Sequence, residues 1–155
     1  MNTNSTKVAS DISGYLGTRW GMTHAEICKV FGKDLCRLSE REDFKGFYAD
    51  HFLPSVEIGE INFEAIFQVS SKTDGLAQVL LRKNADSRDP EVANYQTVQA
   101  VLTRQYGPAR ISTVESPDNP ETQWVFPTTT IGLRLLYVPS VLSLLTISYQ
   151  PTERS

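Results

Sequence analysis

The sequence has few of the residues that catalysis and metal binding require. Among its 155 residues are two histidines, His24 and His51, and two cysteines, Cys28 and Cys36. It contains no G-x-S-x-G, H-E-x-x-H, G-x-G-x-x-G or Walker A motif, which excludes the common signatures of hydrolases, zinc proteases and nucleotide-binding proteins. The two cysteines leave open both one disulfide and two free thiols, and they decide no compartment.

Long apolar runs and clusters of basic residues are also missing. The most apolar run, SVLSLLTISY, is about ten residues long, too short for a membrane span but suitable for a strand. The 15 basic and 18 acidic residues are scattered and give a net charge of -3, so no footprint for a phosphate backbone is present. We therefore expect neither membrane insertion nor nucleic-acid binding.

The N-terminal stretch MNTNSTKVASDISG lacks the basic region and apolar core of a secretory signal. This predicts a flexible leader over residues 1–13 and a cytoplasmic protein, or a periplasmic one if the chain is the trimmed form of an exported protein. The composition, 40% hydrophobic and 21% charged, is typical of a globular chain. We expect one domain over residues 14–150, with halves at about 14–84 and 88–150, and a flexible tail over 151–155.

Two helices are predicted from their ends. Thr23 and Glu26 have the T-x-x-E spacing of a capping box, and Gly32 can end the helix, which predicts a helix over 23–31. The second helix is expected to start at Asp89 and Pro90 and to end at Gly107-Pro108. Its apolar residues recur at helical spacing at Tyr95, Val98, Leu102 and Tyr106.

Alternating apolar residues predict the strands. Residues 61–69 and 76–83 form an expected hairpin around SKTDG, and residues 122–127, 130–138 and 141–149 are three further strands, the last two joined by a tight turn at Pro139-Ser140. Residues 33–59 have no regular pattern. We interpret them as a long connection that holds one short strand at most.

The two halves of the chain share a pattern. Each has a helix that ends in an aromatic residue and glycine, Phe31-Gly32 and Tyr106-Gly107, and INFEAIFQV and LAQVLLRK correspond to TIGLRLLYV and LSLLTISYQ. This indicates an internal duplication of a helix-plus-hairpin unit. The prediction is an α+β fold, an antiparallel sheet with two helices packed on one face.

The stretch GMTHAEICKVFG resembles the opening helix of small bacterial envelope domains of the SmpA/OmlA lipoprotein type, in which G-M-S/T-x-x-E/Q-V/I leads through a short helix to L/F-G. The matching residues are Gly21, Met22, Thr23, Glu26, Ile27, Phe31 and Gly32. Lys33 stands where that family usually has proline, and no lipobox precedes the motif. Tandem copies of such a unit resemble the architecture of the β-lactamase inhibitor protein. The resemblance implies a non-enzymatic domain that binds another protein.

Two groups of residues contain side chains that can bind metals or act in catalysis. His24 and Cys28 share a helix face, with Cys36 beyond, but structural zinc normally takes four good ligands, so we expect no metal and no cofactor. Asp50 and His51 are adjacent, and neighbouring side chains in an extended chain point to opposite sides. No nucleophile is identifiable beside them, so no catalytic residue is expected.

The apolar residues carry the better signal. One sheet face, which the helices should cover, holds Ile61, Phe63, Phe67, Val69, Ile131, Leu133, Leu135 and Tyr137. The opposite face also carries apolar residues, and with an aromatic segment it forms the predicted binding surface: Phe44, Phe47, Tyr48, Phe52, Ile66, Leu80, Leu136, Leu142 and Leu144. Three explanations stay open: the segment 44–52 lies over this face, a partner or second copy covers it, or a slip of one residue exchanges the faces.

The sequence therefore predicts a non-catalytic bacterial protein-binding module, such as an inhibitor, an immunity protein or an assembly factor. Acidic residues at the rim of the surface, Glu40, Glu42 and Asp43, would meet a basic partner. The first alternative is a small-molecule-binding protein or hydrolase with a cavity between sheet and helices and Asp50 and His51 at its mouth. The second is a self-associating structural subunit, such as a homodimer.

Overall fold

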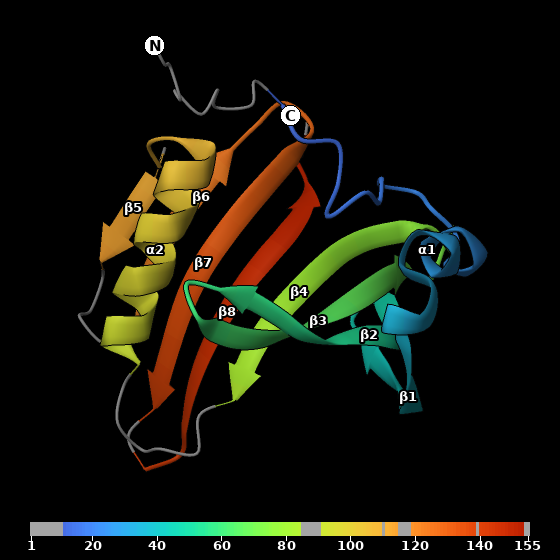
Figure 1. The fold of residues 1–155 in the computed structure, drawn as a ribbon, viewed down its shortest axis with the longest axis horizontal. Helices are drawn as coiled ribbons and strands as arrows, with labels where there is room; N and C mark the ends of the chain where they lie inside the picture. The colour runs from blue at the N-terminus through green and yellow to red at the C-terminus, as the bar shows by residue number, and fades with distance from the viewer. Residues whose placement is uncertain (1–10, 85–90, 110, 115–118, 139, 154–155) are drawn as a thin grey trace.

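The computed structural model describes residues 11–84, 91–109, 111–114, 119–138 and 140–153. Its elements in chain order (Figure 1) are α1 (His24–Phe31), the 3-10 turn η1 (Gly32–Asp34), β1 (Cys36–Phe44), β2 (Phe47–Ile58), β3 (Ile61–Ser70), β4 (Leu76–Asn84), α2 (Val92–Tyr106), β5 (Ile111–Val114), β6 (Pro120–Val125), β7 (Thr129–Val138) and β8 (Leu142–Pro151). The predicted α+β fold is confirmed.

All described strands belong to one antiparallel sheet of order β1-β2-β3-β4-β8-β7-β6-β5. Strands β1 to β4 follow one another as neighbours, and so do β5 to β8. The two sets meet where β4 pairs with β8. Each helix is thus followed by four strands, where the sequence had predicted a hairpin and at most one short strand after the first helix and three strands after the second.

The first helix starts as the capping box requires. The Thr23 hydroxyl accepts from the Glu26 amide at 3.3 Å, and the Glu26 carboxylate accepts from the Thr23 amide at 3.1 Å. Gly32 ends the helix with a φ of 56°, a value that glycine adopts without strain. The predicted boundaries of this helix are confirmed.

The prediction for residues 33–59 is wrong, because this segment forms the strands β1 and β2. Its alternation is hidden by bulges: the register shifts between Arg37 and Glu42 on β1, and between Tyr48 and His51 and between Leu53 and Val56 on β2. A bulge adds a residue to one strand and so breaks the period of two on which strand prediction depends. The hairpin turn lies at Gly46, whose φ is 85°.

The second half departs from the sequence prediction at its ends. Helix α2 is described from Val92, with Glu91 at its N-cap, whereas the expected start, Asp89 and Pro90, lies outside the described residues. Strand β5 was not predicted. Strand β6 begins at Pro120 and ends at Val125, and of the expected turn Pro139-Ser140 only Ser140 is described, with a φ of 64°.

One buried hydrophobic cluster contains residues of both helices and of the sheet. Its members include Ile27 of α1, Tyr95, Val98 and Leu102 of α2, and Phe63, Phe67, Leu81, Ile131, Leu133, Leu135 and Ile147 of the strands. Six of the eight residues predicted for the core face are buried, whereas Ile61 and Tyr137 are partly exposed. Complete burial of a side chain of this size contributes about 1.5 to 3 kcal/mol.

Helix α2 is also anchored by polar contacts. The Trp124 indole donates to the carbonyl of Gly107 at 2.9 Å, and the Gln99 amide donates to the Thr122 hydroxyl at 3.0 Å. At Gly59, in the turn between β2 and β3, an added Cβ would lie 3.0 Å from a methyl group of Thr97 on α2. Figure 1 shows this turn reaching α2 from the other half of the molecule.

The described chain ends contact the sheet, within the residues predicted as a leader (1–13) and a tail (151–155). The Asp11 carboxylate accepts from the Thr128 amide at 2.8 Å and from its hydroxyl at 2.6 Å. Pro151 still belongs to β8, and the Thr152 hydroxyl donates to the carbonyl of Phe126 at 2.6 Å. Neither of the two described helices is long and apolar enough to cross a membrane.

The capping box gives the first prediction. Replacing Thr23 by Ala removes the acceptor for the Glu26 amide, so the free energy of unfolding should fall by about 1 kcal/mol in urea denaturation. Thr103→Ala, on an exposed position of α2, is the matched control and should change the free energy by less than about 0.5 kcal/mol. Equal losses in the two variants would contradict a capping role for Thr23.

Candidate functional site

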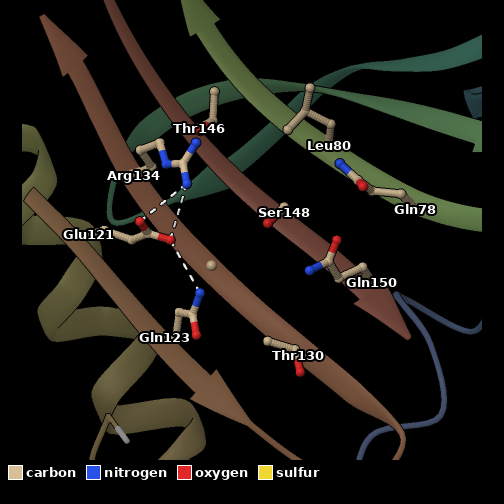
Figure 2. A pocket seen from close by; sticks show the side chains of 10 residues that line it. Gln78, Leu80, Glu121, Gln123, Thr130, Arg134, Thr146, Ser148 and Gln150 are labelled. Atoms are coloured by element: carbon tan, nitrogen blue, oxygen red, sulfur yellow. Dashed lines mark hydrogen bonds and ion pairs between the residues drawn. The ribbon is translucent and has the colours of Figure 1, made fainter. Parts of the chain in front are cut away.

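A polar groove crosses the strands β4, β8, β7 and β6 on the sheet face opposite the buried cluster (Figure 2). Its volume is about 280 Å³. The lining residues are Gln78, Leu80, Glu121, Gln123, Thr130, Gly132, Arg134, Thr146, Ser148 and Gln150. They alternate along each strand with core residues such as Val79, Leu133 and Ile147. One face of these strands is therefore buried and apolar, and the other face is polar.

The sheet register arranges the groove in rows. One row runs across the strands as Leu80, Ser148, Gly132 and Gln123. Gly132 leaves the middle of this row without a side chain. A Cβ at this position would lie 3.0 Å from the Ser148 hydroxyl, which is a tight contact. The glycine thus leaves room in the groove on a central strand.

Two arginines mark the next row. Arg134 donates to both carboxylate oxygens of Glu121, at 3.2 and 3.3 Å. On the other side, Arg82 donates to Glu64 at 2.8 Å and to Glu42 at 2.9 and 3.1 Å. The charges of Arg134 and Glu121, the two charged residues that line the groove, balance each other. Arg82 with Glu42 and Glu64, in contrast, leaves one excess negative charge beside the groove.

The contact between Arg82 and Glu42 indicates that the sheet is curled in the first half of the chain. Glu42 lies on β1, three strands from β4 in the order of the sheet. The sheet must curl for these side chains to meet. Because Arg82 already pairs with Glu42, this acidic residue is not free at the rim to meet a basic partner, as the sequence had suggested.

Most lining side chains are not engaged with one another. Among the residues drawn in Figure 2, only Arg134, Glu121 and Gln123 are joined by hydrogen bonds or ion pairs. The hydroxyls of Thr146 and Ser148 and the amides of Gln78 and Gln150 therefore face the groove with donors and acceptors to offer.

The structure brings part of the predicted surface together. Phe52, Ile66 and Leu80 are cross-strand neighbours on β2, β3 and β4, so they continue the row of Ser148 and Gly132. Leu80 lines the groove and is partly exposed. The expected exposure of Ile66 is wrong: its side chain is 0% exposed and cannot contact a partner. Gln68 on the same strand face is also buried, which indicates that the curled first half covers this region.

The remaining predicted residues lie apart. Leu136 and Leu144 face each other across β7 and β8, and Leu136 is 41% exposed. The backbone of Leu142 pairs with Val138, but its side chain lies outside the described residues. Phe44 and Phe47 pair at the β1–β2 turn, and both are partly buried.

Tyr48 does not belong to the groove face. Its ring lies 5.6 Å from the ring of His24 on α1, and its hydroxyl donates to Asp74 at 2.7 Å. Sequence reasoning grouped it with the other aromatics, but Tyr48 pairs with Val69, a residue of the core face, and therefore lies on the side of the sheet that faces the helix. The polar groove residues were missed, although uncharged polar residues alternate along the end of β8 at Thr146, Ser148 and Gln150.

A second polar cluster lies between α1 and β2, and we call it the Cys-His cluster: Cys28, His51, His24, Asp50 and Arg41. Asp50 accepts two hydrogen bonds from Arg41, each of 3.0 Å. The expectation that Asp50 and His51 point to opposite sides is wrong, because the bulge after Tyr48 changes the alternation and both side chains approach His24.

The two sides of this cluster differ in their electrostatics. Hydrogen bonds from Arg41 lower the pKa of the Asp50 carboxyl below its ordinary value. Burial lowers the pKa of His51, and the neighbouring His24 adds to the effect. His51 therefore resists protonation while Asp50 stays ionised. Within the described part of the chain, no three His, Cys, Asp or Glu side chains are arranged to hold a metal ion.

The lowered pKa of His51 predicts a dependence of stability on pH. Below about pH 6.5, the ordinary value, the unfolded chain takes up a proton that folded His51 resists, so the free energy of unfolding should fall as the pH decreases. The melting temperature should drop between about pH 7.5 and about pH 5.5. His51→Gln should reduce this drop, whereas Gln96→Ala on the exposed side of α2 should leave it unchanged. Identical drops in His51→Gln and the unmodified chain would refute this role of His51.

No protein-family model, no curated protein and no solved structure matches the chain. The function must therefore be inferred from the chemistry of the described side chains.

Proposed function

We propose that the protein is a non-catalytic protein-binding module that receives side chains of a partner in the polar groove on β4, β8, β7 and β6. The observation that carries the proposal is that the amides of Gln78 and Gln150 and the hydroxyls of Thr146 and Ser148 make no side-chain hydrogen bond within the described part of the chain. A regular sheet has satisfied its own backbone, so these side chains remain available for intermolecular hydrogen bonds. An inhibitor, an immunity protein or an assembly factor would use such a surface.

The composition of the groove favours a polypeptide over a small molecule. Small-molecule sites are concave and mostly apolar, and they bury most of the ligand in about 300 to 1,000 Å³. This groove holds about 280 Å³, and Leu80 is the one large apolar side chain among its lining residues. One or two polar side chains of a partner would fill it, while the rest of the partner would contact the surrounding strands.

An apolar pair extends the proposed interface. Leu136 and Leu144 lie on the strands β7 and β8, and Leu136 is exposed on the same strand face as Arg134. Protein interfaces combine an apolar centre with polar contacts, and the apolar part supplies most of the free energy of binding. We expect Leu136 to contribute more to affinity than any single amide of the groove.

We also infer that the chain is a tandem repeat, with each unit consisting of a helix and four strands and with both helices on the core side of the sheet. The strand order, in which β1 to β4 mirror β5 to β8 about the β4–β8 pair, supports this inference. The capping box at Thr23 and Glu26 supports the resemblance to SmpA/OmlA-type domains. A bacterial origin and a role at the cell envelope remain part of the proposal.

The proposal is tested by capturing partners with the intact chain and comparing groove variants. Ser148→Tyr fills the groove, and Leu136→Asp places a charge on the apolar pair. Each should weaken binding of a captured partner at least about tenfold, equal to about 1.4 kcal/mol, because the tyrosine occupies the space of the partner's side chains and the aspartate removes an apolar contact. Binding is measured by calorimetry with the purified partner.

Matched controls keep the substitution and change its place. Gln96→Tyr lies on the exposed side of α2, and Leu16→Asp replaces a leucine that is 59% exposed away from the groove. Both should bind as the unmodified chain does, with melting temperatures that confirm folding. A partner that binds Ser148→Tyr and Leu136→Asp at full affinity would remove the groove from the interface. A second copy of the chain as sole partner would make the surface a dimer interface.

A further inference from the structure

The side chains of the Cys-His cluster lie in a row that the proposed binding function does not use, and the buried Nε2 of His24 makes no hydrogen bond among the described residues. The Cys28 sulfur lies 4.0 Å from Nε2 of His51, and Nδ1 of His51 lies 3.3 Å from Nδ1 of His24. Nε2 of His24 lies 3.6 Å from Asp50, whose carboxylate is held by Arg41. His24 and Cys28 are four residues apart on α1, so the helix presents both to β2.

Two orders of donors and acceptors keep every group neutral except Asp50 and Arg41, and the favoured one turns an N–H of His24, not a lone pair, toward the Asp50 carboxylate. Two Nδ1 atoms in contact require one N–H and one lone pair. If His51 donates to His24, then Nε2 of His24 carries the other proton and faces the Asp50 carboxylate. Nε2 of His51 is then unprotonated and faces the Cys28 thiol, which makes His51 an acceptor for the thiol proton.

The same contacts also allow a form of the cluster in which the Cys28 thiol has lost its proton. When the thiol proton moves to Nε2 of His51 and the proton on Nδ1 of His51 moves to His24, the cluster contains a thiolate, a neutral His51 and an imidazolium at His24. Nε2 of His24 then carries a proton 3.6 Å from the Asp50 carboxylate. His51 accepts the thiol proton, His24 accepts the proton that His51 releases, and Asp50 acts as a positioning residue.

We propose that Cys28 is a modification site at which the thiol reacts with low-molecular-weight disulfides. The Cys28 thiolate attacks one sulfur of the disulfide, a new bond forms between the two sulfurs, and the original sulfur–sulfur bond breaks. The leaving thiolate takes the proton that the two histidines hold. The products are a mixed disulfide on Cys28 and one free thiol, so no other oxidant is required.

The setting of Cys28 suits a small reactant. Its side chain is partly exposed, and it lies on a helix next to exposed Lys29. Thiol–disulfide exchange needs access to the sulfur and an acceptor for its proton, and it does not need an enclosed substrate pocket. The thiolate is the reacting form, so a base 4.0 Å away raises the rate if it takes the proton.

Cys36 provides a control within the same chain. It is also free and partly exposed. It lies on β1, where its neighbour Arg37 is paired with His51, so its own side chain points away from the cluster. A difference in reaction rate between the two thiols is therefore caused by their surroundings, because the side chain itself is the same.

The test measures the reaction of each thiol with oxidised glutathione near neutral pH. Cys36→Ser leaves Cys28 as the one thiol, Cys28→Ser leaves Cys36, and mass spectrometry follows the mixed disulfide. We expect Cys28 to react at least about tenfold faster than Cys36 in the folded chain. In urea, where the cluster is lost, the two rates should become equal.

Variants in the Cys36→Ser background separate the relay from local structure. His51→Gln keeps a polar side chain but cannot take the proton, so the rate at Cys28 should fall at least about tenfold. Asp50→Asn should lower it less, because it removes only the charge that favours the imidazolium. Melting temperatures show whether each variant folds. If His51→Gln does not fold, the rate in Asp50→Asn decides the test.

Two outcomes would overturn the proposal. One is equal reactivity of Cys28 and Cys36 in the folded chain. The other is an unchanged rate at Cys28 in folded His51→Gln and Asp50→Asn. Either result leaves the groove on the opposite sheet face untouched, so failure here is distinguishable from failure of the protein-binding proposal.

Discussion

The antiparallel pairing of β4 with β8 is the contact on which the rest of the structure depends. Pairs from Val79–Tyr149 to Asn84–Leu144 join two sets of four strands into one sheet. Without this pairing each set would have an open edge, which is a site for unwanted strand pairing. The same pairing places Leu81 beside Ile147 in the core and Leu80 beside Ser148 in the groove.

The two faces of this central pair serve different purposes. On one face the side chains are buried with Ile27 of α1 and with Tyr95, Val98 and Leu102 of α2 in a single cluster. On the other face uncharged polar side chains line the groove around Gly132. The buried face provides the rigidity that the proposed binding surface would need, since core residues fix the strands from which the groove side chains project.

The Cys-His cluster shows how local irregularity creates chemistry. A regular β2 would place Asp50 and His51 on opposite sides, and His24 would face only one of them. The bulge after Tyr48 brings both toward α1, where His24 and Cys28 share a helix face. The cluster thus needs the helix spacing, the bulge and the contact between α1 and β2 together.

Local pattern determined much of the fold, and long-range contact decided the candidate sites. The capping box set the start of α1, and regular alternation identified β3, β4, β7 and β8, because these signals depend on residues a few positions apart. The strands β1 and β2 were missed, since their bulges break that alternation. Gln78 and Gln150 line one groove, Arg82 bonds to Glu42, and Cys28 lies near His51, and each of these depends on strand order, sheet curvature or helix placement. Those arise from burial of apolar surface across the whole chain, which no short stretch of sequence specifies.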